Sequence, residues 1–183
     1  QSLFDFDPNR PLAELLADEA VPPEEFDIVI HSHLHWDHAG NVALFDDRET
    51  RMLVGREAAR YAYAPLEIHG RAFLSPTAGY EPSWAETRFS FVEGDAVIAP
   101  GLEAIHTPGH TPGHLSFLVE NGGTTYGLAI DVFPLYENFE GGLHPPGCMN
   151  VFDWWASANR LLGEADVVVP SHDPDGPGTE WIT

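Results

Sequence analysis

The sequence predicts a layered domain of mixed α/β or α+β class. Short apolar runs that are typical of buried strands alternate with segments of helical periodicity and with hairpin-like turns. A chain of 183 residues falls in the size range of one domain, and 43% hydrophobic residues are enough for a buried core. We see no internal repeat and no linker that divides the chain, so we predict a single domain over residues 1–183.

Three segments have the pattern of a helix. Leucines recur at helical spacing within residues 12–20, and a pair of prolines is expected to end that helix. Residues 56–63 and 153–162 are the other two predicted helices. Asp153 is the expected N-cap of the last one, because its carboxylate can accept hydrogen bonds from the first backbone N–H groups.

Strands are expected where apolar residues run together or alternate with polar ones. Asn121-Gly122-Gly123 separates two such runs and is a strong hairpin signal. Residues 65–83, in which proline, glycine and aromatic residues mix, are expected to form a loop and are a candidate part of a substrate pocket. The predicted strands are residues 26–30, 51–54, 88–92, 96–98, 102–105, 115–119, 124–130 and 167–169.

Acidic residues outnumber basic ones by 29 to 8, and all the bases are arginine, so the formal net charge is −21. A field of that sign repels phosphate backbones, which argues against a nucleic-acid partner. No apolar stretch reaches the roughly 20 residues that span a bilayer, so we expect no membrane segment. No charged-then-apolar leader opens the chain. We therefore expect a cytoplasmic location, with a secretory signal removed before position 1 as the alternative.

Four potential metal ligands fall within six residues, directly after a predicted strand. Side chains at i and i+2 of an extended segment point to one side, which brings His33 and His35 together. Asp37 and His38 come where the chain can turn into a helix, so they can face a second point nearby. The spacing suits two neighbouring metals better than one. Imidazole and carboxylate ligands suit zinc, iron or manganese, and the absence of cysteine among these ligands argues against a closed structural zinc site.

Further candidate ligands follow other predicted strands. The sequence from His106 to His114 places three histidines in Pro-Gly turns, and Asp131 and His172 each stand at the end of a buried apolar run. Strand ends on one edge of a sheet are where ligands usually gather in α/β folds. Four separate segments that each deliver a ligand at such a place favour a metal centre over a structural cluster.

These residues resemble a known family. The run from His33 to His38 matches the H-x-H-x-D-H signature of the metallo-β-lactamase superfamily, and the later histidines and Asp131 match its remaining ligand positions in order. The resemblance covers nearly the whole chain and implies an αβ/βα sandwich with the metals at one edge. It implies that His33, His35 and His110 hold the first metal, that Asp37, His38 and His172 hold the second, and that Asp131 bridges the two.

Within the superfamily, the N-acyl-homoserine lactonase branch is the most similar, over residues 31–40, 106–117, 137–140 and 171–173. Lactonases typically carry a tyrosine three residues after the bridging aspartate, where this chain has Pro134. Tyr136 is the nearest tyrosine and therefore the candidate for that catalytic role. Family members normally begin with strands that precede the first helix, so we expect the N-terminal strands of the fold to be missing from these residues.

The resemblance implies a hydrolase with two divalent metal ions, most simply Zn²⁺, with Fe, Mn or Co as alternatives. Hydroxide formed from a shared water would attack the carbonyl of a lactone or ester, and Asp37 would receive or relay a proton. The expected partner is a small lactone or ester, as in quorum quenching. A homodimer is possible, and the sequence leaves the oligomeric state open.

Three other functions remain as alternatives. A thioester hydrolase of glyoxalase II type shares the ligand set, but only about ten residues follow His172, too few for its C-terminal helical domain. A phosphodiesterase is disfavoured by the charge, and a non-enzymatic metal scaffold is the last alternative. Among the other histidines, His31, His106 and His114 are expected to orient ligands or support the structure, and His69 and His144 to have no catalytic role. The aromatic core candidates are Trp36, Trp84, Phe133, Tyr136, Phe139, Trp154 and Trp155.

Overall fold

The computed structural model describes residues 11–45 and 49–173. The chain divides into two compact units, Gln1–Val92 and Glu93–Thr183. The predictions that residues 1–183 form a single domain, and that they lack the first strands of the fold, stay predictions.

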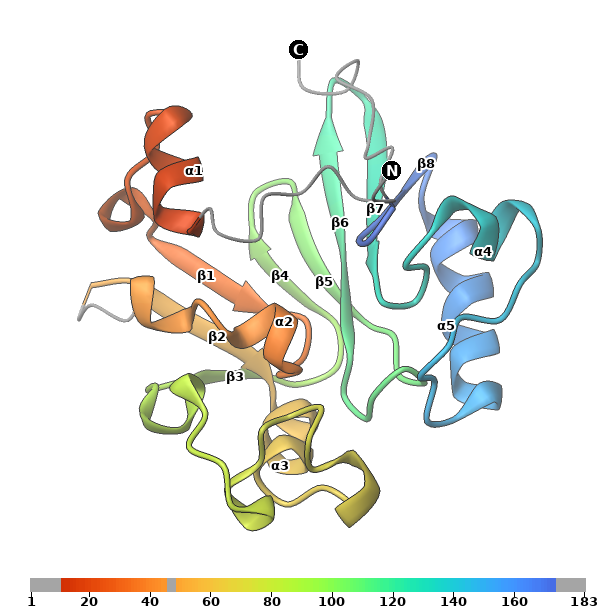
Figure 1. Cartoon of the computed structure of the whole chain (residues 1–183). Helices are drawn as coiled ribbons and strands as arrows, with labels where there is room; N and C mark the ends of the chain where they lie inside the picture. Colours follow the sequence, from red (N-terminus) through yellow and green to blue (C-terminus); the bar gives the residue numbers. More distant parts are fainter. Residues whose placement is uncertain (1–10, 46–48, 174–183) are drawn as a thin grey trace, which may run out of the picture. The chain divides into compact units, whose positions relative to one another are not determined.

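The first unit contains a parallel sheet of three strands in the order β1-β2-β3 (Figure 1). Its strands are β1 (Ile28–His31), β2 (Arg51–Gly55) and β3 (Ser90–Val92). The register pairs His31 with Val54 and Leu53 with Ser90. Because the strands are parallel, their carboxyl ends lie at one edge of the sheet, and the ligand-rich run leaves β1 at that edge.

The helices of this unit are short: α1 (Leu12–Asp18) precedes β1, α2 (Trp36–Ala39) lies between β1 and β2, and α3 (Arg56–Tyr63) follows β2. The structure confirms the helices predicted at residues 12–20 and 56–63, although α1 ends earlier than the proline pair. The expected loop over residues 65–83 contains the 3₁₀ turns Glu67–His69 and Pro76–Ala78 and the start of a third, Ser83–Glu86. Two further 3₁₀ turns are Pro23–Glu25 and Val42–Leu44.

The second unit contains a five-stranded sheet in the order β4-β5-β6-β7-β8. Neighbouring strands are antiparallel except β7 and β8, which are parallel. The predicted hairpin is confirmed: Gly122 and Gly123, with φ values of 60° and 85°, join β6 to β7. The strands are β4 (Ala96–Ala99), β5 (Leu102–His106), β6 (Leu115–Asn121), β7 (Thr124–Ile130) and β8 (Val167–Pro170).

Helix α5 (Val151–Glu164) packs against β7 and forms the core of the second unit with it (Figure 1). Gly127 of β7 permits this approach, since a Cβ there would lie 2.7 Å from the Cβ of Ala165. The indole Nε1 of Trp154 donates to the carbonyl of Val132 at 2.8 Å. The buried cluster comprises Ile105, Ala129, Val132, Phe133, Trp154, Ala158 and Leu161. A shorter helix, α4 (Tyr136–Glu140), lies between β7 and α5 in the sequence.

The expected N-cap of α5 is wrong. The helix begins two residues earlier than predicted, and Asn150 caps it by accepting hydrogen bonds from the N–H groups of Phe152 and Asp153 at 3.0 and 3.3 Å. Asp153 instead accepts from the side-chain amide of Asn150 at 2.7 Å. Asn150 has the extended backbone that an N-cap requires, whereas Asp153 is already helical.

Two of the predicted core aromatics are also wrong. Trp36 is 59% exposed and Trp155 is 62% exposed, whereas Trp84, Phe133 and Trp154 are buried as expected. Trp155 follows Trp154 on a helix, where successive side chains point about 100° apart, so one sheet-facing side cannot take both.

Within residues 11–45 and 49–173, no helix has the length and apolar character needed to cross a membrane.

Candidate metal centre

In the first unit, the predicted ligands between β1 and α2 lie together. The ring centroid of His33 is 4.5 Å from that of His35 and 4.3 Å from that of His38. The Nε2 atom of His38 lies 3.6 Å from a carboxylate oxygen of Asp37. His35 has an extended backbone and α2 begins at the next residue, so the chain changes from strand-like to helical geometry within the run. This is the change of direction that the spacing predicts.

Neighbouring groups orient the rings of the two histidines. The hydroxyl of Ser32 lies 3.0 Å from Nδ1 of His33, so Nε2 is the nitrogen that His33 would offer to a metal. The ring of His35 packs on Phe73 with centroids 4.4 Å apart. His33 and His35 are both buried. The rings are therefore fixed by packing and hydrogen bonds before any metal binds.

His31, the last residue of β1, is a buried and neutral side chain of this unit. Burial lowers its pKa to about 4, opposed by a hydrogen bond with the backbone of Leu53. Its ring meets Phe89 edge to face, with centroids 5.5 Å apart. At neutral pH this histidine adds no positive charge next to the ligand run, which agrees with the structural role expected for it.

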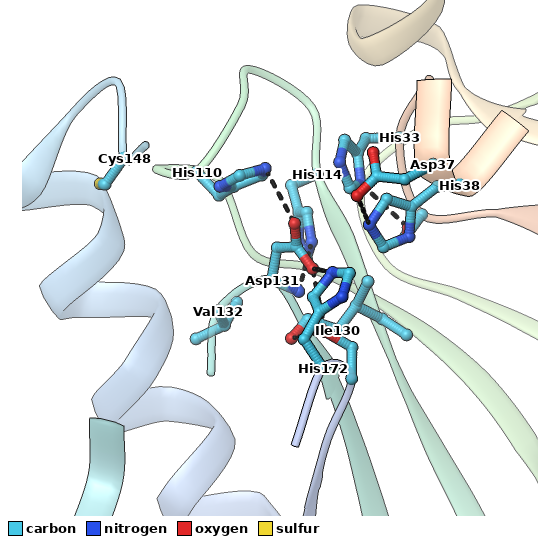
Figure 2. A network of polar contacts seen from close by, with 12 residues as sticks. His33, Asp37, His38, His110, His114, Ile130, Asp131, Val132, Cys148 and His172 are labelled. Carbon is cyan, nitrogen blue, oxygen red and sulfur yellow. Dashed lines mark hydrogen bonds and ion pairs between the residues drawn. The ribbon is translucent and has the colours of Figure 1, made fainter. Parts of the chain in front are cut away.

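In the second unit, a buried carboxylate lies between two imidazoles. One oxygen of Asp131 is 3.1 Å from Nε2 of His110, and the other is 3.2 Å from Nε2 of His172. Figure 2 shows Asp131 between these two rings. Asp131 is only 5% exposed, His110 is also buried, and His172 is partly open to solvent. The hydroxyl of Ser171 lies 3.0 Å from one of the same carboxylate oxygens.

The turn that carries His110 is locked against the start of α5. Gly109 has a φ of 135°, and its carbonyl accepts from the N–H groups of Met149 and Asn150 at 2.8 and 2.9 Å. Cys148 donates to the same carbonyl at 3.2 Å. Burial raises the pKa of this thiol, so the cysteine is engaged as a donor and not as a thiolate ligand. The Pro-Gly turn that carries His110 is thus hydrogen-bonded to the residues that precede α5.

The strand end that carries Asp131 is held by His114, which the sequence predicts to orient ligands or support the structure, and by two serines that the sequence did not single out. His114 accepts the backbone N–H of Asp131 at 3.4 Å, and Ser116 donates to the carbonyl of Ala129 at 3.0 Å. Ser171 donates to the carbonyl of Ile130 at 3.0 Å. The only signal for these serines was a hydroxyl residue beside or between candidate ligands, which is too common to be informative.

Tyr136 is the first residue of α4. Its backbone N–H donates to the carboxylate of Asp173 at 2.8 Å, and its ring lies 5.7 Å from that of Phe139. Pro134, where a tyrosine was expected, has a structural role: its carbonyl accepts the backbone N–H of His172 at 2.8 Å. Pro134 thus positions one candidate ligand directly.

The remaining histidines lie outside these groups. His69 bonds the hydroxyl of Tyr61 at 2.6 Å, and His144 packs its ring against Trp154 at 4.9 Å. The backbone N–H of His106 donates to Asp95 at 2.8 Å. The contact of His106 agrees with the structural role predicted for it, whereas the absence of a catalytic role for His69 and His144 stays a prediction.

The donor set fits a divalent metal with a preference for nitrogen and oxygen ligands. Two atoms bound at about 2.1 Å to one tetrahedral cation lie about 3.4 Å apart, close to the separations between Asp131 and the nitrogens of His110 and His172. A carboxylate with a different imidazole on each oxygen has the arrangement of a bridging ligand. Histidine and aspartate donors at strand ends of an α+β fold therefore define a candidate metalloprotein.

The chain matches the metallo-beta-lactamase superfamily over residues 6–172, and it belongs to that superfamily. It is 35% identical over 134 residues to an N-acyl homoserine lactonase of a Bacillus species, in a match that covers 70% of this chain and 47% of the relative. It is 30% identical over 164 residues to the N-acyl homoserine lactonase AttM of Agrobacterium fabrum, which covers 84% of this chain and 60% of that protein. The chain thus spans about half the length of the curated relatives it matches.

A solved structure shares the fold. An N-acyl homoserine lactone hydrolase with the product N-hexanoyl-L-homoserine bound at its catalytic metal center matches 90% of this chain and 62% of its own length, with a TM-score of 0.72 and 27% identity. The α+β class and the metallo-β-lactamase-like fold predicted from the sequence are therefore confirmed.

Proposed function

We propose that this chain belongs to a dinuclear metal-dependent hydrolase that opens lactones, with N-acyl homoserine lactones as the substrate class. The observation that carries the proposal is the Asp131 carboxylate, which is buried between His110 and His172 with one imidazole at each oxygen. The substrate class is supported by the curated relatives named N-acyl homoserine lactonase. The proposed ligands are His33, His35 and His110 for one metal, Asp37, His38 and His172 for the other, and Asp131 for both.

Zinc is the proposed metal, because imidazole and carboxylate donors suit it and because all three proposed ligands of the first site are histidines. Two bound divalent cations would supply a lowered pKa for water and a Lewis acid for the substrate carbonyl. The chain's own residues supply the rest. Ser32 orients His33, and the carbonyl of Pro134 holds the backbone of His172. The buried position of Asp131 keeps its carboxylate away from competing water.

We propose that Asp37 moves the proton when the ring opens. Its carboxylate is partly open to solvent and lies 3.6 Å from His38, so it can take a proton from one side while its other oxygen remains a ligand. Tyr136 is the proposed donor to the substrate carbonyl. Tyr136 is the first residue of α4 and lies five residues after Asp131. The tyrosine of the family is expected two residues earlier, at position 134.

Two alternatives use the same donors on other substrates. A thioester would release a thiol, and a phosphodiester would release an alcohol or phenol. The net charge of −21 disfavours polyanionic substrates, and no observation on the described residues favours the thioester over the lactone. The cytoplasmic location that the sequence predicts, and the homodimer that the sequence leaves open, are proposals of the same kind. Cell fractionation tests the first and light scattering of the purified chain tests the second.

The test is metal content and hydrolysis on one sample. The Zn²⁺-loaded chain should hold two metals and release protons from N-acyl homoserine lactones without a leaving group. Asp37→Asn, compared at full loading with two metals, should lose about 100-fold or more in rate, because the amide cannot take the proton. His144→Leu, a change at an exposed histidine, should change neither. A loaded chain that cleaves thioesters or phosphodiesters but not lactones contradicts the substrate class, and a chain that binds no metal contradicts the whole proposal.

A further inference from the structure

The residue before Asp131 has a backbone conformation that its side chain opposes. Ile130 ends β7 with a φ of 52°, and the N–H of Val132 donates to the carbonyl of Ala129 at 3.2 Å, which closes a tight turn. Positive φ at the second position of such a turn favours glycine, asparagine or aspartate, and a β-branched residue there is a true outlier. Something outside the turn must therefore hold Ile130 in place.

A fully buried histidine contacts this turn. The backbone N–H of Asp131 points at Nε2 of His114 over 3.4 Å. A backbone N–H can only donate, so Nε2 is the acceptor and the ring proton of His114 is on Nδ1. That Nδ1 lies 2.9 Å from the hydroxyl oxygen of Thr107, which therefore accepts from it. The tautomer of His114 follows from its partners.

The chain of hydrogen bonds continues to the other side of Ile130. The hydroxyl of Thr107 lies 2.8 Å from that of Ser116, and Ser116 donates its single proton to the carbonyl of Ala129 at 3.0 Å. Ser116 must then accept from Thr107. Every hydrogen bond in the series thus has one direction. The series starts at the N–H of Asp131 and ends at the carbonyl of Ala129, on the two sides of Ile130.

We propose that His114 is a positioning residue for the metal centre. With Thr107 and Ser116 it holds Ile130 in the left-handed conformation, and this aims the Asp131 carboxylate at His110 and His172. Figure 2 shows the ring of His114 beside Ile130 and Asp131. The inference rests on the proposed function, because it assigns a purpose to the position of a proposed bridging ligand.

The three members have no access to water that could replace a lost bond. Thr107, His114 and Ser116 are all fully buried. If one of them loses its polar atom, the neighbouring donor or acceptor stays unsatisfied and the series breaks. Ile130 then relaxes toward negative φ, which rotates the following residue and moves the carboxylate of Asp131 away from its two imidazoles. Metal affinity should fall, because partners that orient a ligand are typically worth 10- to 100-fold in binding.

The experiment measures Zn²⁺ affinity by competition with a chelator, together with the tautomer of His114 by NMR of its ring nitrogens. His114→Leu and Thr107→Val should weaken Zn²⁺ binding about tenfold or more. Thr107→Ser keeps the hydroxyl and His114→Gln keeps an acceptor for Asp131, so both should restore affinity to within a few-fold of the starting protein. His144→Leu, at an exposed histidine of the same unit, is the matched control and should change nothing.

A second change separates positioning from general support of the core. Ile130→Gly removes the conformational cost, so it should recover most of the affinity lost in Thr107→Val if the series acts by holding that turn. If it recovers none, the mechanism is wrong. Should His114→Leu fail to fold, the pair Thr107→Val and Thr107→Ser decides the question, because both are small changes at one site.

The two proposals fail in different ways. If the unaltered chain binds no Zn²⁺, the proposed function fails. A proton found on Nε2 of His114 would overturn the hydrogen-bond series, whether or not Zn²⁺ binds. If the unaltered chain binds Zn²⁺ and Thr107→Val binds it equally well, the metal centre stands and the positioning role of His114 is wrong.

Discussion

Gly109 lies against Trp154 so closely that a Cβ on Gly109 would be 2.3 Å from the backbone nitrogen of Trp154 and 2.6 Å from its Cβ. The turn that carries His110 therefore fits directly onto the start of α5. Because the obstructing atoms are mostly backbone, no side-chain rotation can relieve the overlap. Glycine at this position couples the helix to the turn that carries the candidate ligand His110.

Gly109→Ala should be strongly destabilising. The added methyl group collides with the α5 backbone and also occupies a φ of 135° that L residues rarely adopt, so we expect a loss of about 3 kcal/mol or more in the free energy of unfolding. Urea unfolding followed by circular dichroism measures it. Gly122→Ala is the matched control, since Gly122 also has positive φ but has open space around it, and it should cost only about 1 kcal/mol. Equal losses at the two sites would mean that the overlap is absent.

Asn150→Ala tests the N-cap of α5. It removes the acceptor for two backbone N–H groups and should cost about 1 kcal/mol in unfolding free energy, whereas Asn150→Asp should cost much less because the carboxylate is also a good cap. Asp153→Ala should have a smaller effect than Asn150→Ala. The reverse order would restore Asp153 as the cap, as the sequence first suggested.

The case of α5 shows what the sequence could reveal of the fold. The apolar periodicity of residues 153–162 predicts the helix, but its first turn contains the exposed Val151 and Phe152, which periodicity does not recognise as helical. The hairpin between β6 and β7 was predictable because Gly122 and Gly123 alone suit positive φ there. Trp155 was wrongly predicted to lie in the core, because periodicity shows which face of a helix is apolar but not whether a sheet covers that face.

The residues of the candidate site also divide into those that the sequence could predict and those that it could not. His33, His35, Asp131 and His172 were predictable because each follows an apolar run that must end at a sheet edge. The left-handed Ile130 was not predictable, since isoleucine is among the least expected residues at positive φ. The hydrogen-bond series of Thr107, His114 and Ser116 depends on three side chains at the end of β5 and the start of β6 meeting in space. A single sequence contains no signal for such a meeting.

Trp154→Phe should destabilise the second unit. It removes the indole N–H that donates to the Val132 carbonyl, leaves that buried carbonyl without its side-chain donor and opens a small void, so we expect a loss of about 2 kcal/mol. Trp155→Phe is the neighbouring control and should stay within about 0.5 kcal/mol, because Trp155 is exposed. Thermal and urea unfolding both report the difference. A similar loss for the two variants would argue that helix propensity, not the hydrogen bond, is being measured.

The pair between Asp95 and Arg160 should make stability depend on pH. Arg160 donates two hydrogen bonds to the carboxylate at 2.8 and 2.9 Å, which is the main cause of the lowered pKa of Asp95, and the N–H of His106 adds to it. A folded pKa below the unfolded value of about 3.9 stabilises the protein above that value, and the stabilisation is lost as pH falls through the folded pKa.

Asp95→Asn should therefore lower the unfolding free energy near pH 7, and the difference should shrink as the pH falls below about 3.9 and through the folded pKa of Asp95. Both side chains are partly exposed, so solvent screening limits the effect to about 0.2–1 kcal/mol. Added salt should reduce it further. Urea unfolding of the two proteins across this pH range is the measurement. A difference that grows toward low pH would reverse the sign and contradict the assigned cause.

Metal removal should reveal how much of the stability depends on the proposed centre. A ligand that binds only the folded chain adds RT ln(1 + [L]/Kd), which is about 4 kcal/mol when free Zn²⁺ exceeds its Kd a thousandfold. Zn²⁺ should therefore raise the urea midpoint and a chelator should reverse the gain, whereas Mg²⁺ should give little because histidine ligands do not suit it. Asp131→Asn should lose most of the gain, since an amide is a poor bridge between two cations, and Asp95→Asn should keep it because Asp95 pairs with Arg160. An equal gain in both variants would mean that Zn²⁺ stabilises the chain at a place other than the one centred on Asp131.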